Sequence, residues 1–248
     1  MPPRSSIPMG NLALPPFTRG VKWILIISVA VSILVPLGGR FGELVSTAVA
    51  FSPAAVWHGW VWQLFTYTLL HRSPNGIIFA VLGLWLMGGS LEAMWGTRRF
   101  VTFYVGTSAL AALATAFLAL FSGDLAQQVY FGNGVVLEAL AAAFAVLLPS
   151  ATIFLIVLPI QARLLLPISA GITLLLMIYY GVAAFLPHAF ALGAGVLLAG
   201  GVRTPRQMWL RVRVWWIDKR LRSRKLRVVR GDDDVPGHGR SGSDKYLH

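Results

Sequence analysis

Long apolar runs separated by short polar breaks dominate the pattern of this chain. A helix that crosses a bilayer needs about 20 mostly apolar residues. Six stretches approach that length, and they are residues 23–38, 76–95, 100–121, 134–149, 164–185 and 188–202. The fourth and sixth are short, which a bundle tolerates when neighbouring helices shield their ends from lipid. The pattern therefore predicts an all-α membrane protein with six transmembrane helices.

The segment between the first two stretches is apolar but interrupted. Pro53, His58 and Gly59 break its helical pattern, and three tryptophans follow one another at short intervals, namely Trp57, Trp60 and Trp62. Tryptophan favours the boundary between membrane and water. We therefore expect a first loop with short helices lying in the interface, rather than a seventh span.

The composition agrees with a membrane protein. Hydrophobic residues make up 56% of the 248 positions and charged residues only 12%, whereas soluble domains carry about 25% charged residues. The chain has no cysteine, which excludes disulfides and thiol chemistry. No cofactor and no metal site are expected.

The positive charges are distributed unevenly. With six spans both termini share one side, and that side carries all but two of the 21 Lys and Arg residues, the exceptions being Arg40 and Arg72. Positively charged loops stay in the cytoplasm. The prediction is a multi-pass protein, of a bacterial inner membrane, with both termini cytoplasmic.

Three regions follow from these patterns. Residues 1–21 are proline-rich and are expected to be disordered, residues 22–202 form the membrane domain, and residues 203–248 form a basic cytoplasmic tail. Within the tail, tryptophans are interleaved with Arg and Lys, as in helices that lie on anionic lipid. Membrane lipids are therefore the expected partner, and nucleic-acid binding is not expected. The sequence leaves the oligomeric state open.

Several short motifs occur in a telling order. "WQLFTYTLLH" leads into the second span, "LWLMGGSLEAMWGTRRF" closes it, "FGNG" precedes the fourth, "LPIQARLLL" opens the fifth, and a lone histidine stands at the sixth. Over residues 55–202 this order resembles the rhomboid family of intramembrane serine proteases.

The resemblance assigns a role to several positions. Asn133 stands at the nucleophile position, between Gly132 and Gly134 of the turn, where the family has a serine. The remaining positions are His188 as the base, Ala191 and Gly195 as small residues after it, Gly76 and Ala80 at the oxyanion positions, and Leu137 where an aromatic ring often stacks on the histidine. Acyl transfer needs an activated nucleophile, and asparagine does not supply one. The two oxyanion side-chain donors are missing as well.

The resemblance therefore implies a catalytically inactive member, a pseudoprotease. Inactive members of the wider superfamily, such as the iRhoms and derlins, bind other membrane proteins, so a transmembrane client held between the second and fifth spans is the expected partner. Two alternatives stay open. One is an active rhomboid-type endopeptidase with an altered site, and the other is a proton or solute pathway that uses Glu138 and His188.

The polar residues of the fourth and sixth spans each allow two interpretations. Asn133 precedes the fourth helix, so its side chain either only caps that helix or also bonds His188. Glu138 lies about 140° further around the helix, so the two side chains do not point the same way. An ionisable residue within a membrane suggests function, but a protonated Glu138 bonded to a neighbouring carbonyl, Thr or Tyr explains it equally well. His188 either serves chemistry or simply satisfies a neighbour.

Overall fold

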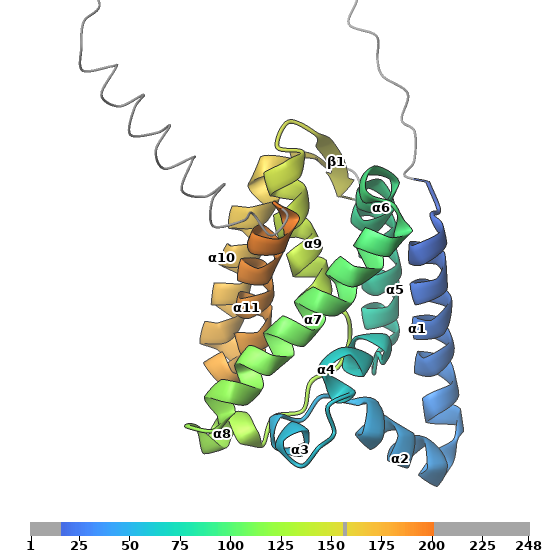
Figure 1. Cartoon of the computed structure of the whole chain (residues 1–248), viewed down its shortest axis with the longest axis vertical. Helices are drawn as coiled ribbons and strands as arrows, with labels where there is room; N and C mark the ends of the chain where they lie inside the picture. The colour runs from blue at the N-terminus through green and yellow to red at the C-terminus, as the bar shows by residue number, and fades with distance from the viewer. Residues whose placement is uncertain (1–15, 156–157, 201–248) are drawn as a thin grey trace, which may run out of the picture. The chain divides into compact units, whose positions relative to one another are not determined.

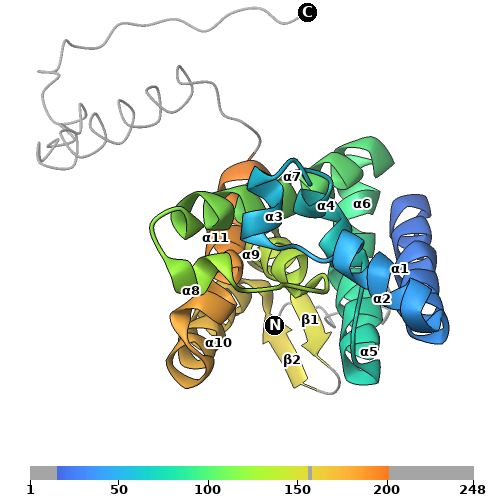
Figure 2. The ribbon, with the colours of Figure 1, turned by 90° about the horizontal axis from the view of Figure 1, so that it is seen from below.

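The computed structural model describes residues 16–155 and 158–200, which form a bundle of helices (Figures 1 and 2). Five of its helices are long and apolar enough to cross a membrane, and α9 is a shorter apolar helix. The long segments are α1 (Arg19–Leu37), α5 to α6 (Pro74–Trp95), α7 (Thr97–Ala119), α10 (Leu165–Tyr180) with the preceding turn η3 (Ala162–Leu164), and α11 (Val182–Ala199). The predicted all-α membrane fold is confirmed.

The short helix α9 (Gly134–Leu147) forms much of the core. Nine of its residues are buried, and most of these are small, which lets neighbouring helices approach closely. Helices α7, α10 and α11 pack against it. Because protein covers α9 on most sides, its 14 residues need not match the thickness of the bilayer.

The first loop contains short helices, as predicted. They are α2 (Gly39–Val49), α3 (Pro53–Trp57), α4 (Gln63–Thr66) and the 3-10 turn η1 (Tyr67–Leu69). Trp57, Trp60 and Trp62 are all partly exposed. The indole nitrogens of Trp57 and Trp62 donate to the carbonyls of Ala116 and Ala48, both at 2.9 Å. Each of these two side chains thus has an apolar surface and a satisfied polar end, as in residues at a membrane interface.

The second span is continuous but not uniform. It consists of α5 (Pro74–Gly83), a π-helical turn η2 (Leu84–Gly88) and α6 (Gly89–Trp95). Within α6, the carboxylate of Glu92 accepts hydrogen bonds from the backbone N–H groups of Gly20 and Val21, at 2.7 and 2.8 Å. A carboxylate at the start of a helix satisfies free N–H groups and complements the helix dipole. Glu92 thereby fixes the beginning of α1 against the end of the second span.

Two expectations about the last third of the chain are wrong. The motif at residues 158–166 does not open the fifth span directly, because β1 (Thr152–Leu155) and β2 (Leu158–Gln161) pair there as an antiparallel hairpin, with Thr152 opposite Gln161. The fifth span also ends at Tyr180 instead of residue 185. Gly181 interrupts the helix with φ of +95°, a conformation that glycine adopts without strain. The sixth span consequently begins at Val182, six residues before the predicted start.

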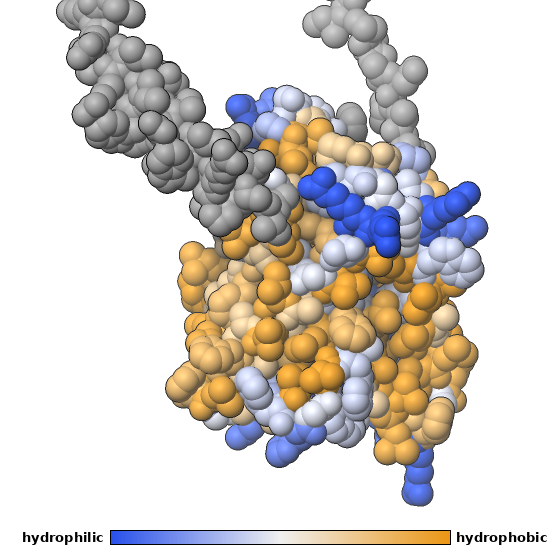
Figure 3. Space-filling model, in the orientation of Figure 1, coloured by the Kyte–Doolittle hydropathy of each residue, from blue (hydrophilic) through white to orange (hydrophobic). Residues whose placement is uncertain are grey.

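The surface of the described region agrees with a membrane setting. On the face seen in Figure 3, a broad apolar band crosses the bundle, and hydrophilic residues gather toward its two ends. Helix α10 has only two buried residues, Leu165 and Thr173, and is the span least covered by protein. The predictions for residues 1–15 and for the basic tail lie outside the described residues.

Candidate functional site: two histidine pairs

The Gly-Asn-Gly turn precedes α9, and the structure places Asn133 in the interior. Gly132 has φ of +83° and its N–H donates to the carbonyl of Tyr67 at 2.9 Å. The Asn133 side chain is buried, and it makes no capping bond to α9. Its Oδ1 instead lies 3.1 Å from Nε2 of His71, and its backbone N–H donates to the same nitrogen at 3.2 Å. The partner of Asn133 is thus His71, and both interpretations of its side chain, a cap of α9 and a bond to His188, are wrong.

The other face of His71 meets α1. Its Nδ1 lies 3.4 Å from Ser28 Oγ and 3.3 Å from Ser32 Oγ, and its backbone N–H donates to Ser32 Oγ at 2.9 Å. Both hydroxyls donate to the carbonyl of Leu69. Because the N–H of Asn133 points at Nε2, this nitrogen acts as the acceptor and Nδ1 carries the proton. Burial lowers the pKa of His71, so the ring is neutral at pH 7.

This tautomer has a consequence for the asparagine amide. Because Nε2 of His71 is an acceptor, the Asn133 amide is best oriented with its donor, Nδ2, toward His71 and its oxygen toward Tyr104. The Tyr104 hydroxyl is near Asn133 and Thr68, and it is buried with no partner among the described residues, as is Nδ2 of Asn133. Exchanging the amide oxygen and nitrogen, which are nearly the same size, brings the Tyr104 hydroxyl closer to an acceptor and Nδ2 of Asn133 closer to Nε2 of His71.

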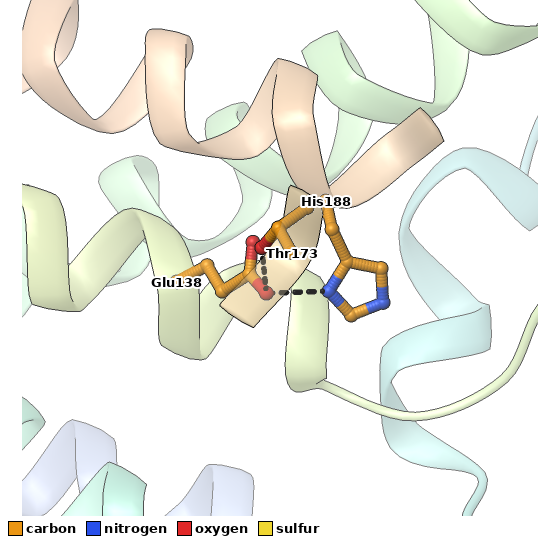
Figure 4. Close-up of polar contacts among 3 residues, drawn as sticks. All are labelled: Glu138, Thr173 and His188. Carbon is orange, nitrogen blue, oxygen red and sulfur yellow. Dashed lines mark hydrogen bonds and ion pairs between the residues drawn. The ribbon is translucent and has the colours of Figure 1, made fainter. Parts of the chain in front are cut away.

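A second pair joins α9, α10 and α11. Oε1 of Glu138 accepts a hydrogen bond from Thr173 Oγ1 at 2.9 Å and lies 3.0 Å from Nδ1 of His188 (Figure 4). The other ring nitrogen of His188 points away from the carboxylate. The side chains of His188 and Glu138 are 21% and 17% exposed. Oε2 of Glu138 is buried and has no partner among the described residues.

The position of His188 depends on how α11 accommodates a proline. Pro187 lies within α11, and because it has no N–H it leaves the carbonyl of Ala183 without a helical partner. The hydroxyl of Tyr130 donates to that carbonyl at 2.6 Å. Burial raises the pKa of Tyr130 to about 12, so this hydroxyl remains a donor at neutral pH. The helix therefore continues through Pro187 and carries His188 in its second turn.

Glycines set the spacing between α9 and α11. A Cβ added at Gly134 would lie 3.1 Å from Cε1 of His188, and one added at Gly195 would lie 2.4 Å from the carbonyl oxygen of Ala139. Ala191, one helical turn from Gly195, is fully buried. These small residues let α11 pack closely enough for His188 to reach Glu138.

The remaining positions named by the resemblance lie in the second span and on α9. Gly76 lies in the first turn of α5, where its N–H donates to Ser73 Oγ at 3.1 Å. Ala80, one turn later, is buried, and neither side chain can donate to an oxyanion. Leu137 packs against Gly83. The ring beside His188 is that of Phe185, at 5.2 Å between centroids.

Sequence reasoning assigned no role to His71 and missed Ser28, Ser32, Tyr130 and Thr173. Ser28 and Ser32 lie one turn apart within an apolar span, and that spacing was the available signal for a polar partner on another helix. Tyr130 and Thr173 carry no comparable signal. Among the described residues, no three His, Asp or Glu side chains gather as they would around a metal ion.

The fold and its two histidine pairs define a rhomboid-like, multi-pass integral membrane protein. The chain belongs to the family described as eukaryotic integral membrane protein (DUF1751), whose profile matches residues 19–199. It is also similar to rhomboid proteases named GlpG. Identity is 31% over 115 residues with the protein of Pectobacterium atrosepticum and 30% over 118 residues with that of Salmonella typhi. The resemblance predicted from the motifs is confirmed.

These similarities cover only part of the proteases. The matched residues make up 46% of this chain and 38% of the Pectobacterium protein, and 47% and 42% for the Salmonella protein. The chain thus spans about two fifths of the length of these relatives.

Proposed function

We propose that this protein is a rhomboid-like pseudoprotease that binds other membrane proteins without cleaving them. The observation that supports this proposal is the environment of Asn133. The residue at the nucleophile position is an amide whose side chain is directed at His71 and away from the base position, His188. Neither Gly76 nor Ala80 offers a donor to a tetrahedral intermediate. Nucleophile and side-chain oxyanion donors are thus lost together.

The expected partner is a transmembrane segment of another protein. This part of the proposal rests on the fold and on the analogy with inactive superfamily members, because a shared fold alone does not determine function. The exposed flank of α10 and the exposed side chains of α5, among them Ile78 and Phe79, provide an apolar surface for such a segment.

An active endopeptidase with an altered site is the second candidate, and the Glu138–His188 pair favours it. In serine hydrolases a carboxylate orients the catalytic histidine through Nδ1, and the histidine acts as the base through Nε2. Glu138 and His188 have the same arrangement, with Nε2 directed away from the carboxylate. A reaction would need a nucleophile other than Asn133. The same two groups, in contact within the membrane, also keep the proton or solute pathway as a further alternative.

A cleavage assay tests the proposal. The full chain, reconstituted in liposomes, is expected neither to cleave a generic transmembrane substrate nor to react with a serine-directed fluorophosphonate. Asn133→Ser alone should not restore activity, because each missing oxyanion donor typically costs ~10²–10³ in rate. The triple variant Asn133→Ser, Gly76→His, Ala80→Asn has the better chance. Cleavage by the unmodified chain that is lost in His188→Ala would overturn the pseudoprotease proposal.

The proposed topology places both termini in the cytoplasm, which is supported by the concentration of Lys and Arg on one side of the six spans. A cytosolic reporter fused to the C-terminus should be active, and activity of a lumenal or periplasmic reporter there would contradict it. The type of membrane stays a prediction, because the family is described as eukaryotic whereas the similar proteases are bacterial.

The tail is proposed to lie on anionic lipid. A peptide of residues 211–230 should bind anionic vesicles, and the binding should weaken as salt shortens the screening length to about 10 Å at 0.1 M. Equal binding to neutral vesicles would contradict the electrostatic contribution.

A further inference from the structure

A pocket of about 350 Å³, lined by both apolar and polar residues, lies where α1, α2 and the chain after η1 meet. Its lining includes Glu43 and Ser46 of α2 together with His71 and Arg72. The pocket is thus within the usual size range of sites for small ligands or headgroups. It is separate from the Glu138–His188 pair, and it shares only His71 with the Asn133 pair.

Two opposite charges line this pocket without pairing. The guanidinium of Arg72 donates to Ser46 Oγ at 3.2 Å and lies 3.6 Å from the centroid of the Phe131 ring, so both contacts hold its position. The carboxylate of Glu43 has no partner among the described residues, where the only ion pair is that of His188 with Glu138. Arg72 therefore keeps free donors, and Glu43 keeps free acceptors in the same pocket.

An apolar groove of about 250 Å³ adjoins the pocket that contains Arg72 and Glu43. It runs between α1 and α2, and Val35 and Gly42 line both depressions. The side chains of Leu34, Phe41 and Val45 contribute to its walls. A Cβ added at Gly42 would lie 1.8 Å from the carbonyl oxygen of Val35, so glycine is required for α2 to pack this closely on the end of α1.

Both depressions lie beside α2, at one end of the bundle. Helix α2 lies at the opposite end of α1 from α6, near the other first-loop helices α3 and α4 (Figure 1). Leu37, Phe41 and Leu44 are more than two thirds exposed there, although Arg40 and Glu43 lie among them in the sequence. Apolar and charged side chains alternate in this way where a helix lies in a membrane interface.

We propose that the pocket and groove bind one zwitterionic glycerophospholipid, with a headgroup of the phosphoethanolamine type. Arg72 receives the phosphate through charge-assisted hydrogen bonds, for which the guanidinium fork is suited. Glu43 receives the ammonium, and an acyl chain occupies the α1–α2 groove. An anionic lipid without an ammonium fits less well, because its headgroup leaves Glu43 unpaired beside negative charge. The bound headgroup contacts His71, the residue that holds Asn133.

Native mass spectrometry of the full chain, purified in detergent and titrated with defined lipids, tests this assignment. The probes are palmitoyl-oleoyl phosphatidylethanolamine and the phosphatidylglycerol with the same chains. We expect the first to bind about tenfold more tightly. Arg72→Gln should weaken its binding by about tenfold, as is typical for a lost hydrogen bond to a charged group. Arg72→Lys should give an intermediate value, since it keeps the charge without the planar fork.

The Glu43→Gln variant distinguishes a site for a zwitterionic headgroup from a site for an anionic headgroup. It should weaken phosphatidylethanolamine binding and abolish the preference over phosphatidylglycerol. Arg40→Gln is the matched control, because Arg40 is an exposed cation of α2 that does not line the pocket, and it should leave the preference unchanged. Stronger phosphatidylglycerol binding in the unmodified chain, or a preference that survives in both Arg72→Gln and Glu43→Gln, would overturn the proposal.

The groove is tested with the headgroup alone. Glycerophosphoethanolamine, which has no acyl chains, should compete at least tenfold more weakly than the intact lipid. Equal competition would show that the groove takes no part, and the assignment of an intact phospholipid would then fall. Circular dichroism of each variant checks that the helical content is unchanged.

Discussion

His71 and His188, two histidines of the described region, have different surroundings. His71 is enclosed by neutral groups, with Asn133 on one ring nitrogen and Ser28 and Ser32 on the other, and only 7% of it is exposed. His188 faces a carboxylate on one side only, and its second nitrogen points away from that partner. Both histidines contact α9, the first at its beginning and the second one turn further on.

The comparison contrasts a closed polar site with an open one. Around Asn133 and His71 the hydrogen bonds join neutral groups, as expected of a structural site. His188 is instead oriented by the carboxylate of Glu138 on a neighbouring helix. The His71–Asn133 pair should therefore contribute mainly to stability, whereas the Glu138–His188 pair leaves one ring nitrogen directed away from its partner.

The largest effect is expected from removing His71. His71→Ala leaves the N–H of Asn133 without its acceptor, removes the ring contacts of Ser28 and Ser32, and creates a cavity, which should lower the free energy of unfolding by about 2–4 kcal/mol. Unfolding of the purified protein in detergent micelles measures this. His58→Ala, at an exposed histidine of the first loop, serves as the control and should have little effect. An equal effect of the two substitutions would contradict a structural role for the His71 pair.

The next effect comes from separating α9 and α11. In Gly195→Ala the new Cβ would lie 2.4 Å from the Ala139 carbonyl, so the helices must move apart, at a cost of about 1–3 kcal/mol. The Glu138–His188 contact should be disturbed and the His71–Asn133 contact preserved, because only Glu138 and His188 face each other across the α9–α11 interface. Nitrogen-15 spectra of the two imidazoles check this. Gly193→Ala, where a Cβ meets nothing within 4 Å, is the control and should leave both signals unchanged.

The third expected effect is on the pH dependence of the folding stability. Burial holds the pKa of folded His71 below its ordinary 6.5, so the unfolded chain binds the proton more readily. Stability from this source is fully present above pH 6.5 and is lost as the pH falls from 6.5 toward the folded pKa, by at most about 1.4 kcal/mol per pH unit. Unfolding of the parent and His71→Gln proteins between pH 5 and 8 measures the difference. Curves that run parallel throughout would show that His71 does not titrate differently in the two states.

The smallest effect is expected at Thr173. Thr173→Val removes the donor to Glu138 with little change in shape and should cost about 1 kcal/mol. Thr173→Ser keeps the hydroxyl and should cost less. In a Glu138→Leu background the valine substitution should have no further effect, since the acceptor is already gone. An undiminished cost in that background would show that Thr173 stabilises α10 through packing alone.

Much of the fold was predictable because bilayer physics acts on local composition. Apolar runs, interfacial tryptophans and the break at Gly38 required no knowledge of distant residues. The boundary between the last two helices was predicted at residues 185–188, around Pro187, but the break lies at Gly181. Only the distant Tyr130, which donates to the carbonyl freed by that proline, allows the helix to continue.

The sequence by itself determined the number of spans, the interfacial first loop, and the residue types at the Gly-Asn-Gly turn, because each of these depends on residue type and short-range spacing. It also predicted that Asn133 and Glu138 point in different directions, from the rotation per residue of a helix, although Asn133 lies just before α9. Only the tertiary structure decided their partners. His71 and His188 lie 62 and 50 residues away from them, and the rotation and distance between helices depend on close contacts such as that of Gly195 with Ala139. Helical periodicity describes one helix at a time and carries no information on how two helices are placed against each other.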